Sequence, residues 1–180
     1  MAKLRVAGLV GSRVVELLSD EFEFTPLRYE NGFDITNREI VWNELKELEF
    51  DTFLHLAAYT FVDKAEEENE LCYKINVDGT KNVFEAIKQK GKKFIYISTD
   101  YVFNGTTPDV VFNENSKPEP VGVYGTSKYE GEKIVGNQGM IVRLAYPYRA
   151  SFEKPDFVRK LKSLLEDGKE LKMIVDSIID

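Results

Sequence analysis

Short apolar runs and longer amphipathic segments alternate along this chain. The apolar runs have the length of strands, and they cover residues 4–7, 22–27, 53–58, 94–98 and 140–145. The amphipathic segments carry apolar residues at helical intervals, and they cover residues 14–18, 37–48, 69–90, 124–135 and 157–165. This alternation predicts an α/β fold, a Rossmann-like doubly wound parallel sheet with helices on both faces.

Individual residues locate several element ends. Asn37 is placed to cap the helix that follows it, and Gly91 stands where a glycine ends a helix that starts at residue 69. The run 53–58 barely alternates with polar residues, which is typical of a strand buried on both sides. The segment 103–123 is too long and too rich in glycine and proline for a tight connection, so we expect a loop that lines a site.

Composition restricts the class of function. The chain of 180 residues, 43% hydrophobic and 31% charged, is predicted to form one ordered domain. Its net charge of −7 argues against nucleic acid as a partner, because phosphate binding needs a basic face. It has no signal-like segment and no apolar stretch of about 18 residues, so we predict neither membrane insertion nor secretion. The expected location of the protein is the cytoplasm. The acidic run 66–70 is interpreted as a solvated helix face.

The strongest chemical signal is a tyrosine and a lysine four residues apart, Tyr124 and Lys128. On a helix they share one face, and a lysine cation favours the phenolate, so Tyr124 could exchange a proton near neutral pH. Taken alone, such a pair is more often an exposed tyrosine and lysine at a helix start. Thr99 lies where the run 94–98 ends, at the edge where such sheets bind ligands, and its hydroxyl could bond a carbonyl oxygen; a plain strand-end cap is the alternative.

Other candidate residues carry weaker signals. Gly8 and Gly11 follow the first run and match part of a dinucleotide-binding glycine turn. His55, the single histidine, is expected to be a hydrogen-bonded core residue rather than a base or ligand. Cys72 has no second cysteine with which to form an internal disulfide. No metal-ligand spacing occurs, so no metal site is predicted.

Four blocks occur together and in order, at residues 55–66, 76–82, 98–103 and 123–128. They resemble the blocks of the extended short-chain dehydrogenases/reductases that act on nucleotide-activated sugars, and among these the dTDP-4-dehydrorhamnose reductases. The resemblance covers nearly the whole chain. It implies an NADP- or NAD-dependent oxidoreductase of dTDP-rhamnose biosynthesis, which reduces the C4 ketone of a nucleotide-activated deoxysugar.

The resemblance also assigns roles to residues. Tyr124 would donate a proton to the carbonyl oxygen, Thr99 would bond the same oxygen, and Lys128 would hold the nicotinamide ribose and lower the Tyr124 pKa. The residues implied at the cofactor are Gly8, Leu9, Val10, Gly11, Asp34, Ile35, Leu56, Ala57, Ala58, Tyr59, Asn76 and Lys128. The residues implied at the sugar are Val62, Tyr101 and Tyr146.

Two features depart from the family pattern. The family opens with three spaced glycines after a full strand, whereas here residues 4–7 run directly into Gly8 and Gly11. Family members also continue for roughly another hundred residues of substrate-binding lobe, so residues 1–180 are interpreted as the cofactor-binding domain without that lobe. The sequence does not decide between NAD and NADP, although Arg28 could bind the 2′-phosphate of NADP. It also leaves open whether the chain forms a homodimer.

Two alternative functions stay open on the sequence. An epimerase or dehydratase of the same superfamily would use the same three residues and recycle its cofactor on the enzyme. A non-catalytic binding subunit is the second alternative, since the resemblance extends to the NADP-binding regulatory subunit of methionine adenosyltransferase.

Overall fold

The computed structural model describes residues 8–106, 110–151 and 155–170. In these ranges three strands, β1 (Thr52–His55), β2 (Lys93–Thr99) and β3 (Met140–Leu144), form a parallel sheet in the order β1-β2-β3. Phe53 pairs with Phe94, and Ile97 pairs with Val142. The runs 53–58, 94–98 and 140–145 are therefore confirmed as strands, although β1 ends three residues early. All three carboxyl ends meet at one edge, where parallel sheets bind ligands.

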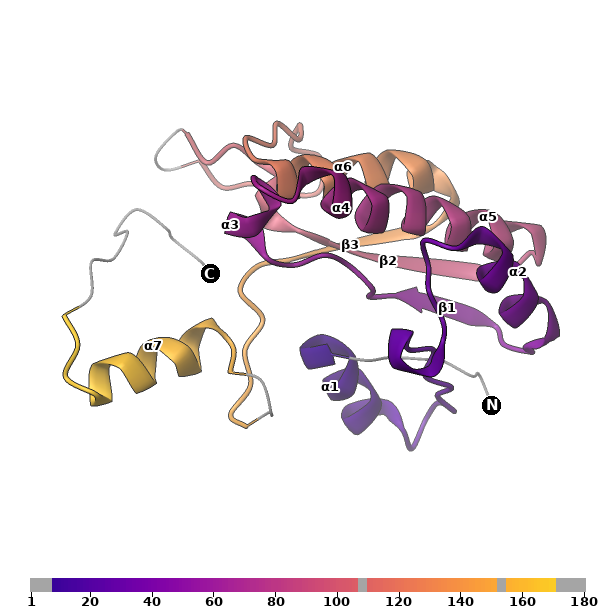
Figure 1. Ribbon diagram of the computed structural model, residues 1–180, viewed down its shortest axis with the longest axis horizontal. Helices are drawn as coiled ribbons and strands as arrows, with labels where there is room; N and C mark the ends of the chain where they lie inside the picture. Colours follow the sequence, from indigo (N-terminus) through magenta and orange to yellow (C-terminus); the bar gives the residue numbers. More distant parts are fainter. Residues whose placement is uncertain (1–7, 107–109, 152–154, 171–180) are drawn as a thin grey trace.

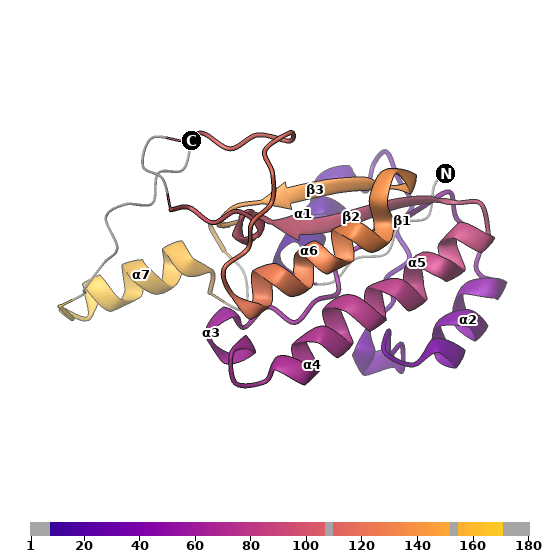
Figure 2. The same cartoon turned by 90° about the horizontal axis from the view of Figure 1, so that it is seen from above.

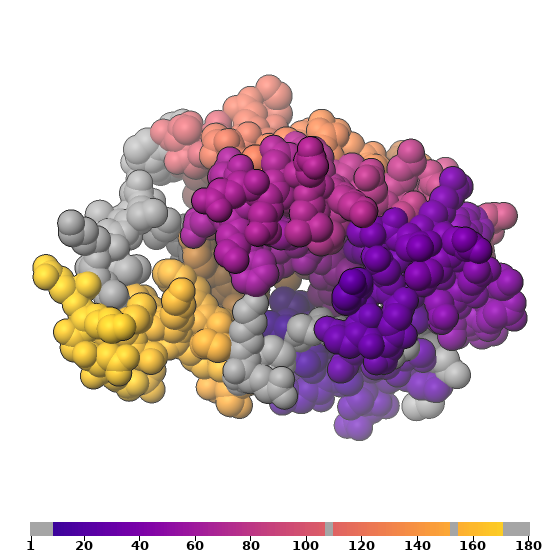
Figure 3. All heavy atoms as spheres, viewed as in Figure 1, coloured from indigo at the N-terminus to yellow at the C-terminus, as the bar shows by residue number. Residues whose placement is uncertain are grey.

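Helices lie on both sides of the sheet (Figure 1). The α-helices are α1 (Gly8–Leu18), α2 (Arg38–Glu47), α3 (Val62–Ala65), α4 (Asn69–Tyr73), α5 (Thr80–Gln89), α6 (Val123–Val135) and α7 (Phe157–Glu166). Helices α4, α5 and α6 cover one face, and α1 lies on the opposite side, as the view from above also shows (Figure 2). The predicted Rossmann-like fold with a helix-covered parallel sheet is confirmed. Helix α7, yellow in Figure 3, projects from one end of the molecule.

The amphipathic segment 69–90 forms one continuous helix with a π-helical middle, Lys74–Gly79, between α4 and α5. Gly79 packs so closely that a Cβ there would lie 2.7 Å from the Ile35 side chain. After α5, Gly91 adopts φ +64° and ends the helix as predicted. Asn37 caps α2 as predicted, since its side chain accepts hydrogen bonds from the amides of Glu39 and Ile40.

Two predictions for the first part of the chain are wrong, and a third lies outside the described residues. The run 22–27 is not a strand, since its backbone forms only an isolated bridge at Glu23. An apolar run becomes a strand only where its backbone pairs continuously. The expected strand 4–7 and the apolar stretch 173–175 lie outside the described residues. The expected glycine turn is also wrong, since Gly8 and Gly11 both lie inside α1. Between Val102 and Val123 the described residues form a loop, as predicted.

The main core lies between the sheet and the helices α2, α5 and α6. It contains Val41, Leu45, Val83, Ile87 and Phe94, all nearly or fully buried. Phe94 stacks on Phe53 in β1 at 6.0 Å between ring centroids, so the two paired strands also bury their aromatic faces together.

A line of polar groups crosses this core. His55 is 2% exposed, and its Nε2 lies 3.1 Å from the Thr80 hydroxyl. Burial, with a smaller contribution from Lys128, lowers the His55 pKa to about 3. The prediction that His55 is a hydrogen-bonded core residue is confirmed. Next to it, the fully buried Tyr96 donates its hydroxyl to the Lys128 carbonyl at 3.2 Å.

This last contact depends on Gly131 in α6. A Cβ at Gly131 would lie 2.2 Å from the Tyr96 hydroxyl oxygen, closer than any real contact. The missing side chain therefore lets α6 approach β2 until the phenol of Tyr96 reaches the Lys128 carbonyl.

We expect His55 to make the fold sensitive to acid. The unfolded chain takes up a proton on histidine near pH 6.5, but the folded chain does so only near pH 3, so stability is lost as the pH falls through this window. At pH 5 the loss is about 2 kcal/mol. Urea unfolding at pH 7.5 and pH 5 will measure it, with His55→Gln as the matched control that keeps an amide near Thr80. An equal loss in both proteins would contradict this assignment.

We expect the contact between Gly131 and Tyr96 to appear as coupling in a double-mutant cycle. Gly131→Ala should destabilise the protein by about 1–3 kcal/mol through overpacking, and Tyr96→Phe by about 1 kcal/mol through the lost hydrogen bond. Because removal of the hydroxyl relieves part of the clash, the double variant should lose clearly less than the sum. Additive losses in urea unfolding would show that the two residues do not constrain each other.

Candidate active site

Thr99, Tyr124 and Lys128 come together where β2 ends beside α6. Thr99 is the last residue of β2, and Tyr124 lies in the first turn of α6. A hydrogen bond between the Thr99 and Tyr124 side chains lowers the Tyr124 pKa, but burial raises it more, so the net pKa lies above its ordinary value. The Thr99 hydroxyl is held by two neighbours, since it donates to Asp100 Oδ1 at 2.9 Å and accepts from the Tyr101 amide at 3.2 Å.

Lys128 lies one helical turn beyond Tyr124 and is 3% exposed. Its Nζ lies over the Tyr96 ring, 4.1 Å from the ring centroid. Burial lowers the Lys128 pKa to about 7, and the Glu132 carboxylate partly opposes this. The expected lowering of the Tyr124 pKa by Lys128 is not what the structure shows, because burial of Tyr124 dominates and its pKa is raised. The lysine is thus poised to change charge near neutral pH.

A cavity of about 490 Å³ opens beside the carboxyl end of β1. Five residues expected at the cofactor line it, namely Asp34, Ile35, Leu56, Ala57 and Ala58. The other lining residues are Leu27, Arg28, Tyr29, Glu30, Phe33, Thr36, Phe53, Leu54, His55, Leu71, Lys74 and Ile75. The walls are therefore mostly apolar, with a few polar groups, which is typical of a small-molecule site.

Asn76 takes a different position from the one expected of a cofactor contact. Its side chain is fully buried in the π-helical segment and binds the Tyr59 backbone twice, accepting from the amide at 2.8 Å and donating to the carbonyl at 3.2 Å. It also donates to Ser127 Oγ at 2.9 Å. Asn76 thus joins the loop after β1 to the helix that carries Lys128, and its contact with a cofactor stays a prediction.

Of the three residues expected at the sugar, Tyr101 contacts Tyr124 and Tyr146 contacts Tyr101. The Tyr101 ring meets the Tyr124 ring edge-on, with centroids 5.7 Å apart. Tyr146 follows β3 with a left-handed φ of +41°, a strained conformation for a tyrosine, and its side chain hydrogen-bonds that of Tyr101. This bond, together with the larger effect of burial, raises the Tyr101 pKa to about 12. Val62 begins α3 and is half-buried.

The first turn of α1 does not contribute to the lining of this cavity. Gly8, Leu9, Val10 and Gly11, all expected at the cofactor, are helical and do not line the cavity. Their contact with a cofactor stays a prediction.

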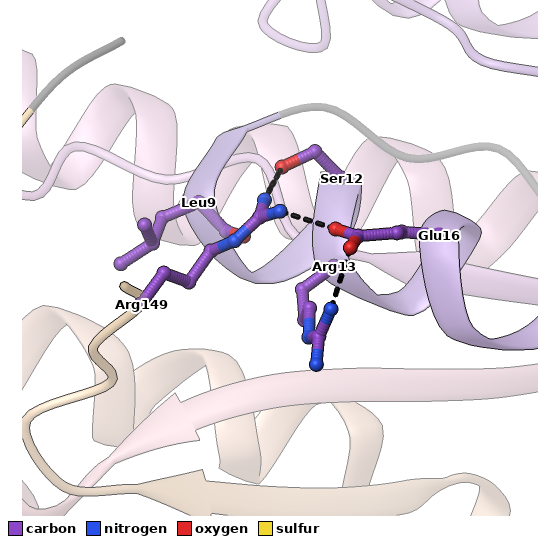
Figure 4. Close-up of polar contacts among 5 residues, drawn as sticks. All are labelled: Leu9, Ser12, Arg13, Glu16 and Arg149. Atoms are coloured by element: carbon purple, nitrogen blue, oxygen red, sulfur yellow. Dashed lines mark hydrogen bonds and ion pairs between the residues drawn. The ribbon is translucent and has the colours of Figure 1, made fainter. Parts of the chain in front are cut away.

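An arginine that sequence reasoning missed reaches this helix from beyond β3 (Figure 4). Arg149 donates to the Ser12 hydroxyl at 2.8 Å and forms an ion pair with Glu16, which also pairs with Arg13. The contact spans more than 130 positions in the sequence. No local pattern marks such a residue, because its partner is set by the tertiary fold.

A buried ion pair behind Lys128 was also missed. Glu132 is 4% exposed and accepts from Arg143 Nε at 2.9 Å and Nη2 at 2.7 Å, and from Ser98 Oγ at 2.6 Å. These three residues tie α6 to β3 and β2. A signal exists in the sequence, because Glu132 follows Lys128 by one helical turn and so shares its inward face.

The acidic run 66–70, interpreted from the sequence as a solvated face, makes two specific contacts. Glu66 Oε1 accepts from the Val123 amide at 2.8 Å, and Glu68 Oε2 accepts from the Tyr59 hydroxyl at 2.5 Å. Two of these carboxylates therefore bind the elements that build the site.

The described residues contain neither a metal-binding cluster nor a membrane-spanning helix. In the part of the chain that the structure describes, no group of three His, Cys, Asp or Glu side chains is arranged to hold a metal ion. None of the helices within the described ranges has both the length and the apolar character needed to cross a membrane.

Comparisons with known proteins agree with this architecture. Residues 6–179 match the family model described as the RmlD substrate binding domain. The dTDP-4-dehydrorhamnose reductase of Sinorhizobium fredii (strain NBRC 101917 / NGR234) is 36% identical over 150 residues, which cover 82% of this chain and 50% of that protein. The chain thus spans about half the length of this curated relative.

Two solved structures are also similar to this chain. The dTDP-4-dehydrorhamnose reductase of Bacillus anthracis str. Ames in complex with NADP matches with a TM-score of 0.82 and 34% identity, over 92% of this chain and 60% of that one. The dTDP-4-dehydrorhamnose reductase of Clostridium acetobutylicum ATCC 824 matches with a TM-score of 0.83 and 32% identity, over 93% and 60%. The chain therefore belongs to the RmlD substrate binding domain family of extended short-chain dehydrogenases/reductases.

Proposed function

We propose that this protein is an NADPH-dependent reductase of the C4 ketone of a dTDP-activated deoxysugar, as in dTDP-rhamnose biosynthesis. The observation that carries the proposal is the convergence of Thr99, Tyr124 and Lys128 where β2 ends beside α6. A cavity of about 490 Å³ opens at the carboxyl end of the neighbouring strand β1, although none of the three residues lines it. The relative and the two solved structures described above carry the name of this reductase.

The side chains present suit the proton transfer that the reaction needs. Tyr124 keeps its proton at neutral pH, because burial raises its pKa, so it is available to donate to a carbonyl oxygen. Thr99 lies beside it, and its hydroxyl would turn from Asp100 to donate to the same oxygen as negative charge develops there. Tyr101 and Tyr146 form a linked pair next to Tyr124 that would face the sugar.

The residues around the cavity fit a dinucleotide. Apolar side chains such as Leu71 and Ile75 offer a surface for a flat base, and Asp34 lies beside them. Arg28 also lines the cavity, which favours a 2′-phosphate and hence NADP. Lys128 would hold the nicotinamide ribose. When bound, the cofactor supplies the hydride.

Several expectations from the sequence are kept as parts of this proposal. Residues 1–180 act as the cofactor-binding domain, the substrate is a nucleotide sugar, and the reaction takes place in the cytoplasm. The reductase is preferred to an epimerase or to a non-catalytic subunit, because the relatives at 32–36% identity described above are named reductases.

We expect Tyr124→Phe to lower kcat by about 10²- to 10⁴-fold, the usual contribution of a positioned acid. Its NADPH dissociation constant should stay within about twofold of the wild type, because Tyr124 does not line the cavity. The measurement is the loss of NADPH absorbance with dTDP-4-dehydrorhamnose. The control is Tyr129→Phe in the same helix. The Tyr129 ring lies under the Lys133 ammonium. If both variants turn over alike, Tyr124 is not the proton donor.

We expect this chain to bind NADPH weakly, with a dissociation constant above about 10 μM, because the residues of the shortened glycine turn are helical and do not line the cavity. Adenosine 2′,5′-bisphosphate, whose contacts we expect to fall within the cavity, should bind within about tenfold of NADPH. Isothermal titration calorimetry measures both affinities, and Ala57→Trp, which fills the cavity, should abolish both. NADPH binding at 1 μM or tighter would overturn this expectation.

A further inference from the structure

The N-terminus of α6, the helix that carries Tyr124 and Lys128, lacks a cap of its own. The residue at its N-cap position is Gly122, which has no side chain to accept a hydrogen bond from the first amides. Its first turn contains no acidic residue that would complement the positive end of the helix dipole. A carboxylate from elsewhere in the chain could meet both requirements.

Glu66 meets both of them. Its Oε1 accepts from the Val123 amide at 2.8 Å, across 57 positions of sequence, and brings a negative charge to the helix start. The fit is close, since a Cβ at Gly122 would lie 3.0 Å from this same oxygen. The glycine that leaves the helix without a cap also makes room for the carboxylate that replaces it.

The contact joins two parts of the site. Glu66 is the C-cap of α3, the short helix that begins at Val62, which we expect at the sugar. Val123 directly precedes Tyr124, whose side chain hydrogen-bonds Thr99. One hydrogen bond thus links the turn on the substrate side to the first turn of the helix that places the proton donor.

We propose that Glu66 is a positioning residue, which caps the catalytic helix from a distance and holds Tyr124 in register with Thr99 and with the substrate-facing turn of α3. This rests on the proposed function only for the role of Tyr124; the cap itself is independent of it. The rest of α6 is anchored separately, through Ser127, Lys128, Gly131 and Glu132, which are all buried. Loss of Glu66 therefore loosens the first turn and leaves the fold in place.

The first test measures whether Glu66 caps the helix, and it needs no enzymatic turnover. Hydrogen exchange of the Val123 amide, followed by NMR, is compared in the wild type, Glu66→Ala, Glu66→Gln and Glu67→Ala. We expect exchange to be about three- to thirtyfold faster in Glu66→Ala. It should be within about twofold of the wild type in Glu66→Gln, which keeps an acceptor oxygen, and in the adjacent control Glu67→Ala. Equal exchange in Glu66→Ala and Glu67→Ala would overturn the cap.

The second test measures whether Glu66 positions Tyr124 for the reaction. With NADPH and dTDP-4-dehydrorhamnose, we expect Glu66→Ala to lower kcat about three- to tenfold, with the NADPH dissociation constant unchanged and the urea midpoint close to that of Glu67→Ala. Glu66→Gln should restore most of the rate. A kcat equal to that of Glu67→Ala, or a loss that Gln does not rescue, would overturn the positioning role. If the wild type itself shows no turnover, the proposed function fails, and the amide exchange still decides the cap.

Discussion

The close approach of α6 to β2 is the constraint on which the rest of the site depends. Gly131 leaves the space in which the Tyr96 hydroxyl reaches the Lys128 carbonyl. The same approach puts the Lys128 ammonium over the Tyr96 ring and out of water, which lowers its pKa to about 7. Because Tyr124 lies on the same helix, its distance from Thr99 at the end of β2 follows from this packing. A side chain at Gly131 would displace the catalytic helix as a whole.

Polar side chains then fix the loops against this rigid pair. The Asn76 amide bonds the Tyr59 backbone and Ser127, so the loop after β1 is tied to α6. These bonds satisfy the polar groups of the amide, as burial requires. The loop positioned in this way contributes Leu56, Ala57 and Ala58 to the cavity lining, and Asp34 and Ile35 come from a separate segment. The cavity is thus built from segments that are distant in sequence and fixed by a few buried contacts.

Local patterns in the sequence were sufficient for features with local causes. The spacing of Tyr124 and Lys128 and the cap at Asn37 depend on neighbours within a few residues, and the structure shows both as predicted. The burial of His55 could be predicted from the apolar run around it, but its partner Thr80, 25 positions away, could not. Features that depend on distant partners were missed. No periodicity reveals that Glu66 binds Val123, or that Arg149 crosses to α1. The run 22–27 failed for a related reason, because its apolar composition cannot supply the neighbouring strand that pairing requires.

The opposite pKa changes of the two ionisable groups agree with the direction of the proposed reaction. Burial raises the pKa of Tyr124 and lowers that of Lys128, so each group is pushed toward its neutral form. A neutral phenol is the form that donates a proton. A raised pKa makes a phenol a weaker acid, but the alkoxide that develops at a reduced ketone is a stronger base than a phenolate. Proton transfer from Tyr124 is therefore favourable without the help of a nearby cation. The hydrogen bond with Thr99, which lowers the same pKa, then acts mainly to orient the donor.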